Sequence, residues 1–161
     1  MIYLLVGDIQ TGKSSALMRW VKGKRQIFGV ISPIGPDKKR FFFEIQTQRR
    51  IIMQAETNDA NTISVGRYHF FNSAFKKANA ILQQNAKEEN NGYIIVDELG
   101  KLELKNQGLD VSVREVIKRT RQDSQLHAIL VVRTSLISAI RNHYNILDAK
   151  ELTTTSLLQL Q

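Results

Sequence analysis

The segment "IYLLVGDIQTGKSS", residues Ile2–Ser15, carries the strongest indication of the fold in this chain. Its first five residues form a short apolar run rich in branched side chains, which predicts a buried strand. Gly7 ends that run, and apolar residues recur at helical spacing after Lys13. A strand, a glycine-containing loop and a helix in this order predict a phosphate-binding loop.

The loop matches the pattern G-x-x-x-x-G-K-[ST] at Gly7, Gly12, Lys13 and Ser14. Gly7 allows the chain to turn out of the strand, and Gly12 lets the main chain pass close to the phosphates. Lys13 brings a positive charge to the β- and γ-phosphates, and the Ser14 hydroxyl ligates Mg²⁺. We therefore expect the nucleotide to be bound by Gly7, Asp8, Ile9, Gln10, Thr11, Gly12, Lys13, Ser14 and Ser15.

The rest of the chain alternates apolar runs with helical patterns, which predicts an α/β fold with a parallel sheet. Further buried strands are expected at 27–32, 93–96 and 128–132, with an edge strand at 149–153. Helices are expected over 71–82 and 109–117, and a short one from residue 136. Three short runs at 40–46, 50–54 and 62–65 predict a small antiparallel insert at about 38–66 of a single domain, 1–161.

A second constellation is "YIIVDELGKLEL", residues Tyr93–Leu104, in which a buried strand ends in paired acids. Such a strand is the expected partner of a phosphate loop. Asp97 would hold Mg²⁺ through a bound water, and Glu98 would accept a proton from the attacking water. Taken alone, the two acids could equally start a loop or cap a helix.

Composition narrows the class of protein. The chain has no cysteine, which excludes disulfides, cysteine-based metal sites and thiol catalysis, and which fits a cytoplasmic protein. No apolar run approaches the length of a membrane span, and the apolar start does not have the pattern of a signal peptide. The formal charge of +8 favours anionic partners, with nucleotides and nucleic acid both open, or simply a basic solvated surface.

Several basic residues are secondary candidates. Ligands of parallel α/β sheets gather at the carboxyl ends of strands, which points to Ser32, Asp97 and Arg133. Arg133 could stabilise charge on the γ-phosphate or be a surface arginine. The helical stripe of Arg114, Lys118 and Arg121 could face nucleic acid or only solvent. Weaker candidates are Arg40 and Arg67, and no metal-ligand spacing links His69, His127 and His143.

The stretch "DELGKLEL" resembles the D-E-I-G-K-M-E-L signature of small P-loop nucleoside-triphosphatases, the cancer-related nucleoside-triphosphatase family. "VGRYHFFNSAF", "GVISPIG" and "KRFFFEI" resemble further segments of that family. The resemblance implies a RecA-like three-layer sandwich with a mostly parallel sheet, and Mg²⁺-dependent hydrolysis of nucleoside triphosphates. It implies phosphate and metal roles for Gly7, Gly12, Lys13, Ser14, Asp97 and Glu98, and it draws attention to Lys101 as a catalytic candidate.

The chain also departs from the family pattern. Gln10 stands where members usually carry glycine, and Ser14 and Ser15 stand where they carry threonine. An acidic and a basic residue are replaced around 34–36, and the usual N-R-D stretch is not evident near the carboxyl terminus. A nucleotide or small-molecule kinase, and a nucleotide-dependent switch that binds nucleic acid or protein, therefore stay open beside hydrolysis.

Overall fold

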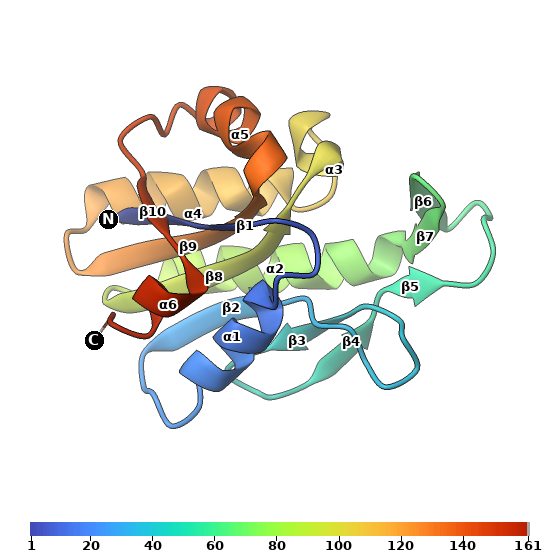
Figure 1. Cartoon of the computed structure of the whole chain (residues 1–161), viewed down its shortest axis with the longest axis horizontal. Coiled ribbons are helices and arrows are strands. Elements are labelled where there is room, and N and C mark those ends of the chain that lie inside the picture. Colours follow the sequence, from blue (N-terminus) through green and yellow to red (C-terminus); the bar gives the residue numbers. More distant parts are fainter. Residues whose placement is uncertain (161) are drawn as a thin grey trace.

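The computed structural model describes residues 1–160 and contains two β-sheets (Figure 1). The larger has seven strands in the order β10-β1-β9-β8-β2-β3-β4, and the smaller has the order β5-β7-β6. The strands are β1 (Ile2–Gly7), β2 (Ile27–Ile31), β3 (Phe41–Glu44), β4 (Arg50–Ile52), β5 (Gln54–Ala55), β6 (Thr62–Val65), β7 (Tyr68–Phe71), β8 (Gly92–Leu99), β9 (Leu126–Arg133) and β10 (Lys150–Leu152). The helices are α1 (Lys13–Trp20), α2 (Asn72–Glu88), α3 (Lys101–Leu104), α4 (Asp110–Gln122), η1 (Thr134–Leu136), α5 (Ile137–Tyr144) and α6 (Thr154–Leu157).

The predicted parallel sheet is confirmed. β1 pairs in parallel with β9 and β10, and β8 pairs in parallel with β9 and β2. The carboxyl ends of these strands therefore meet at one edge, where Gly7 lies opposite Arg133 in register. The expected edge strand near the carboxyl terminus is β10, which lies beside β1.

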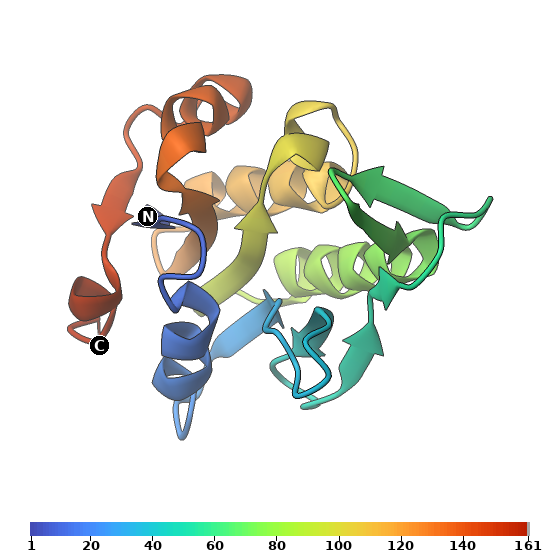
Figure 2. The same cartoon turned by 45° about the vertical axis from the view of Figure 1, so that its right-hand side comes forward.

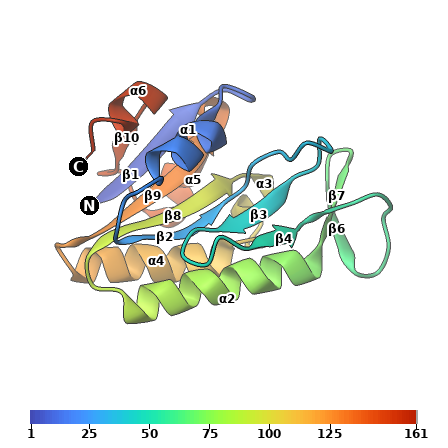
Figure 3. The same ribbon diagram turned by 90° about the horizontal axis from the view of Figure 1, so that it is seen from below.

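Helices cover both faces of the main sheet, which gives the three layers (Figure 3). One core lies between the sheet and α2, α4 and α5, and it includes Leu4, Val96 and Leu130. The other lies between the sheet and α1 and α6, and it includes Leu5 and Ile95. Side chains of a strand alternate between the two faces, so each central strand contributes to both cores.

The antiparallel strands expected at 38–66 are divided between two sheets. β3 and β4 pair antiparallel along the edge of the main sheet next to β2. β6 pairs with β7 and β7 with β5, and this small sheet stands at the amino-terminal end of α2 (Figure 2). β5, β7, α3 and α6 were not predicted as separate elements, because each is only two to four residues long and too short to show a periodic pattern.

The end of the strand at residues 93–96 was predicted wrongly. β8 continues to Leu99, so Asp97 and Glu98 lie within the strand. The pairing with β9 shifts register after Val96 and resumes where Leu99 meets Val132. Leu99 is fully buried, and this buried contact extends the strand beyond the acids that interrupt its apolar run.

Candidate active site

The phosphate loop joins the end of β1 to the start of α1, as the sequence predicted. Its backbone is left-handed at Gln10 (φ 59°) and at Gly12 (φ 79°). A methyl group on Gly12 would have no atom within 4 Å, so open space lies on that side of the backbone. A methyl group on Gly7 would lie 2.6 Å from the Thr11 hydroxyl, so a larger residue there would force the Thr11 side chain to move.

Lys13 is buried beneath this loop. Its ammonium group donates hydrogen bonds to the carbonyl oxygens of Gly7 (2.8 Å) and Asp8 (2.7 Å). Burial lowers the pKa of Lys13, and the nearby carboxylates of Glu98 and Asp97 oppose that change. Lys13 therefore holds its own loop together through acceptors that a phosphate oxygen can replace.

Asp97 meets the first turn of α1 at the carboxyl edge of the sheet. The Ser14 hydroxyl donates to its Oδ2 over 2.6 Å, and the Ser32 amide donates to the same atom over 3.0 Å. The other oxygen, Oδ1, is buried and has no hydrogen-bond partner among residues 1–160. Burial raises the pKa of Asp97 to about 6, despite the two hydrogen bonds that lower it.

These donors fit a magnesium ion. The Ser14 hydroxyl and the Asp97 carboxylate are hard oxygen ligands of the kind that Mg²⁺ prefers, and the unpartnered Oδ1 supplies a further acceptor for an ion or its water. Within residues 1–160 no group of three or more histidine, cysteine, aspartate or glutamate side chains could hold a metal. A cation here would thus depend on substrate phosphates and water for its remaining ligands, which is the usual arrangement for Mg²⁺.

Glu98 and Arg133 form an ion pair between neighbouring strands. Arg133 Nε donates to Glu98 Oε1 over 2.7 Å, with 37% of the arginine side chain and 17% of the glutamate side chain exposed. Arg133 ends β9 directly opposite Gly7. The pair therefore stands beside the phosphate loop, where the sequence suggested each residue separately and gave no sign of their contact.

Arg40 also approaches the acidic strand. Its Nη1 donates to the Ser32 carbonyl oxygen over 3.0 Å, and the amide of that residue holds Asp97. Arg67 donates to the Tyr68 hydroxyl over 3.0 Å in the turn between β6 and β7, and Arg40 and Arg133 are close enough to help lower the pKa of Tyr68. The structure thus gathers Arg40, but not Arg67, into direct contact with the groups around Asp97.

The second half of the acidic signature has a structural role that sequence reasoning missed. Glu103 is buried and accepts hydrogen bonds from the amides of Gly100 (2.8 Å) and Leu109 (3.0 Å). A methyl group on Gly108 would lie 2.3 Å from its Oε1, so the carboxylate fills this bend of the chain. Its position three residues after Gly100 is the sequence signal, since glutamate there commonly caps the start of a helix.

Lys101, the catalytic candidate of that signature, is exposed at the start of α3. Across the described residues it has no hydrogen bond or ion pair that would direct it toward Asp97 or Glu98. Ser15 and Ile9 are likewise exposed, the latter with 60% of its surface accessible at the loop. The structure therefore brings together Lys13, Ser14, Asp97, Glu98, Arg133 and Arg40.

A family model described as NTPase matches residues 2–155. The chain belongs to this NTPase family. The match spans both the phosphate loop and the acidic strand, and it confirms the resemblance carried by the signature at Asp97. A search of curated protein sequences gave no match.

Two solved structures share the fold of this NTPase. The crystal structure of THEP1 from the hyperthermophile Aquifex aeolicus has a TM-score of 0.74 and 17% identity, and the match covers 96% of this chain and 90% of that one. The solution structure of a human cancer-related nucleoside triphosphatase has a TM-score of 0.69 and 17% identity, with 98% and 93% covered. These likenesses confirm the α/β P-loop fold.

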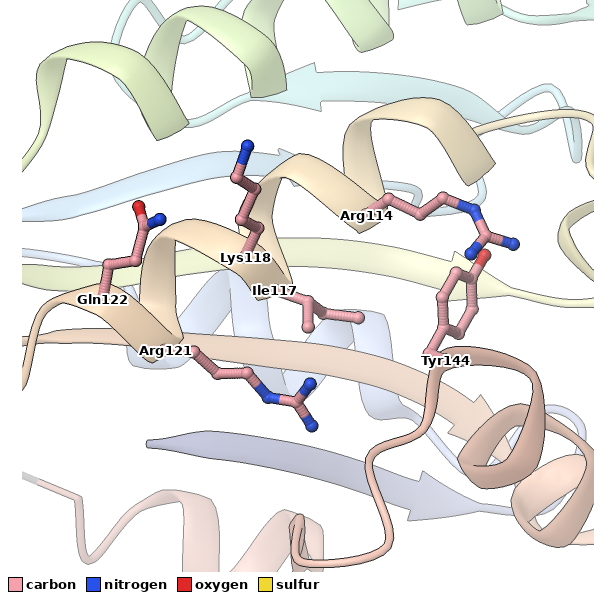
Figure 4. Close-up of a pocket in the computed structure, with 6 residues that line it drawn as sticks. All are labelled: Arg114, Ile117, Lys118, Arg121, Gln122 and Tyr144. Atoms are coloured by element: carbon pink, nitrogen blue, oxygen red, sulfur yellow. The ribbon is translucent and has the colours of Figure 1, made fainter.

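The basic stripe of this NTPase surrounds a pocket of about 410 Å³ on α4 (Figure 4). Arg114 pairs with Asp110 over 3.0 Å, and Arg121 donates to the Asn145 carbonyl oxygen. Two of the three cations are thus used within the fold, which favours the solvated-face interpretation. Every helix within residues 1–160 is too short or too polar to span a lipid bilayer.

The three histidines have partners away from the phosphate loop. His69 contacts the Ser64 hydroxyl, and His127 contacts the amino terminus. His143 Nε2 lies 3.2 Å from Asp110 Oδ1, in a network between α4 and α5. Their separate positions agree with the packing and surface roles expected from their spacing.

Proposed function

We propose that this NTPase hydrolyses the γ-phosphate bond of ATP, GTP and other nucleoside triphosphates with Mg²⁺ as cofactor. The observation that carries the proposal is the contact between the Ser14 hydroxyl and the Asp97 carboxylate, with Lys13 beside it. A hydroxyl, a carboxylate and an ammonium group at the end of one phosphate loop are the set that triphosphate hydrolysis requires.

Each residue has a distinct role in this proposal. The amides of the loop and Lys13 bind the β- and γ-phosphates, with Lys13 exchanging the carbonyls of Gly7 and Asp8 for phosphate oxygens. Ser14 and Asp97 hold Mg²⁺, which when bound neutralises charge on the phosphate oxygens. Lys13 therefore has hydrogen-bond acceptors both without nucleotide, from the carbonyls, and with nucleotide, from the phosphate oxygens.

Glu98 orients the attacking water and accepts its proton. The ion pair with Arg133 supports this role, since it fixes the direction of the carboxylate beside the loop. Arg133 also places a permanent positive charge where negative charge develops on the transferring group. Hydrolysis then needs no acceptor other than water.

The test measures phosphate release from ATP, GTP, CTP and UTP, with Mg²⁺ and with excess chelator. We expect Lys13→Ala and Glu98→Gln each to lower kcat by about a hundredfold or more, as the loss of a charged or proton-accepting group does. Glu115→Gln, an exposed glutamate of α4, is the matched control and should keep wild-type rates. Release that survives Lys13→Ala, or that is unaffected by chelator, would refute the proposal.

A further inference from the structure

A second pocket, of about 520 Å³, lies on the β3–β5 side of the molecule. It is bounded by the loop at 35–40, by β4 and β5, and by the end of β7. Nothing in the proposed hydrolysis uses it. We call it the edge pocket, because β3 and β4 form the edge of the main sheet.

The walls of the edge pocket combine aromatic rings with the side chains of two arginines, Arg40 and Arg50. Phe41 and Phe71 line it, and the Arg50 guanidinium lies 4.8 Å from the centre of the Phe41 ring. Arg50 is exposed and has no ion pair within residues 1–160. Ile52, which is 72% exposed, adds an apolar surface to the lining.

One side of the edge pocket is fixed by internal contacts. Lys39 pairs with Glu56 over 2.6 Å, so this cation and this acid satisfy each other. The Gln54 side chain accepts from the Arg40 amide over 3.0 Å, which anchors the loop to β5. Within residues 1–160, the cations of the lining that have no acidic partner are therefore Arg40 and Arg50.

Arg40 connects the edge pocket to the candidate active site. Arg40 lines the pocket and donates a hydrogen bond to the carbonyl oxygen of Ser32. The backbone N–H of Ser32 in turn donates to the Asp97 carboxylate. In the sheet order the pocket lies beyond β8 and β2, on the side of the acids that is remote from β1. A group bound to Arg40 would thus lie close to Ser32, whose amide donates to Asp97.

We propose that the edge pocket binds a nucleoside monophosphate. The base would pack against Phe41 and the Arg50 guanidinium, because planar rings stack on aromatic and guanidinium faces. The phosphate would bind Arg40, whose planar donors match phosphate oxygens. The site is separate from the triphosphate site and does not require that hydrolysis occurs, so binding alone tests it.

The experiment is a calorimetric titration of the full chain with AMP, CMP, GMP and UMP. It is run both alone and with a non-hydrolysable triphosphate analogue and Mg²⁺ at saturation. We expect one equivalent of monophosphate to bind in both cases. Arg50→Ala should weaken this binding by about tenfold or more, as expected for the loss of a charged contact, and leave analogue affinity unchanged. Lys22→Ala, an exposed cation after α1, is the matched control and should change neither.

Four results would overturn the inference: no monophosphate binding, displacement of monophosphate by the analogue, an Arg50→Ala variant that binds normally, or inorganic phosphate binding as tightly as the nucleotide. Displacement would assign the monophosphate to the phosphate loop, and equal phosphate binding would remove the role of the base. Circular dichroism of Arg50→Ala confirms that the variant is folded. Because phosphate release is measured separately, failure of this inference is distinguishable from failure of the proposed hydrolysis.

Discussion

Replacing Asp97 with asparagine should stabilise the nucleotide-free protein at neutral and alkaline pH. Asp97 is fully buried, and burial is the main reason that its pKa rises from the ordinary 3.8 to about 6. A carboxyl group whose pKa is higher in the folded state than in the unfolded state binds protons more tightly when folded. It therefore lowers the free energy of unfolding progressively as the pH rises from 3.8 to about 6, and by the full amount above that range.

The expected size follows from this pKa. A difference of about two units, at about 1.4 kcal/mol each, corresponds to about 3 kcal/mol at pH 8. Asparagine keeps an oxygen that can accept from Ser14 and Ser32, and its amide replaces an oxygen that already has no partner. The change thus removes a buried charge without adding an unsatisfied atom. For a chain of this length, 3 kcal/mol raises Tm by about 6–12 °C.

The assay is thermal unfolding followed by circular dichroism, with chelator and without nucleotide, at pH 8 and pH 4.5. The gain in stability for Asp97→Asn should be about 3 kcal/mol at pH 8 and only about 1 kcal/mol at pH 4.5. At pH 4.5 the wild-type carboxyl is protonated in the folded state, so less buried charge remains to be removed. Asp148→Asn, an exposed carboxylate on the carboxyl-terminal loop, controls for loss of one negative charge. A variant less stable than wild type at pH 8, or a gain that does not vary with pH, would show that the buried charge is not what limits stability here.

Three further changes test other contacts. Arg133→Ala should lower kcat for phosphate release about a hundredfold, since it frees Glu98 and removes a fixed charge; unchanged initial rates would contradict this. Gly29→Ala should lower the free energy of unfolding, measured in urea, by about 3 kcal/mol. The new methyl group would lie 2.1 Å from the Ile95 carbonyl oxygen, and the backbone there has a φ of +100°, so a loss below about 1 kcal/mol would contradict this clash. Glu103→Ala should lower it by about 2–4 kcal/mol by leaving two buried amides unpaired, while Glu103→Gln should cost less.

The central strands could be predicted from sequence because burial on both faces makes them continuous apolar runs. β1, β2, β8 and β9 all carry this pattern, and the structure pairs them in parallel. The strands of the insert could be located but not paired. Their partners are set by contacts between strands that need not be consecutive, such as β5 and β7, and no local pattern shows whether a strand joins the main sheet or starts another.

The residues of the candidate site could be proposed from sequence, but their contacts could not. The loop spacing pointed to Lys13 and Ser14, and the position of the two acids after a buried strand gained weight only from the presence of that loop. The contact between Glu98 and Arg133 joins residues 35 positions apart, and their pairing depends on the order of β8 and β9 in the sheet. Lys101 shows the converse case, in which a signature residue lies at the surface without a contact to the acids.

The contacts of the free site bear on how tightly it can bind substrate. Lys13 already has two carbonyl acceptors, Ser14 already donates to Asp97, and Arg133 already pairs with Glu98. Binding a triphosphate must therefore exchange these partners, and only the difference between the two sets of interactions contributes to affinity. The unpartnered oxygen of Asp97 is the exception, since a cation satisfies it without displacing a hydrogen bond. Mg²⁺ and the triphosphate should consequently bind much more tightly together than either does alone.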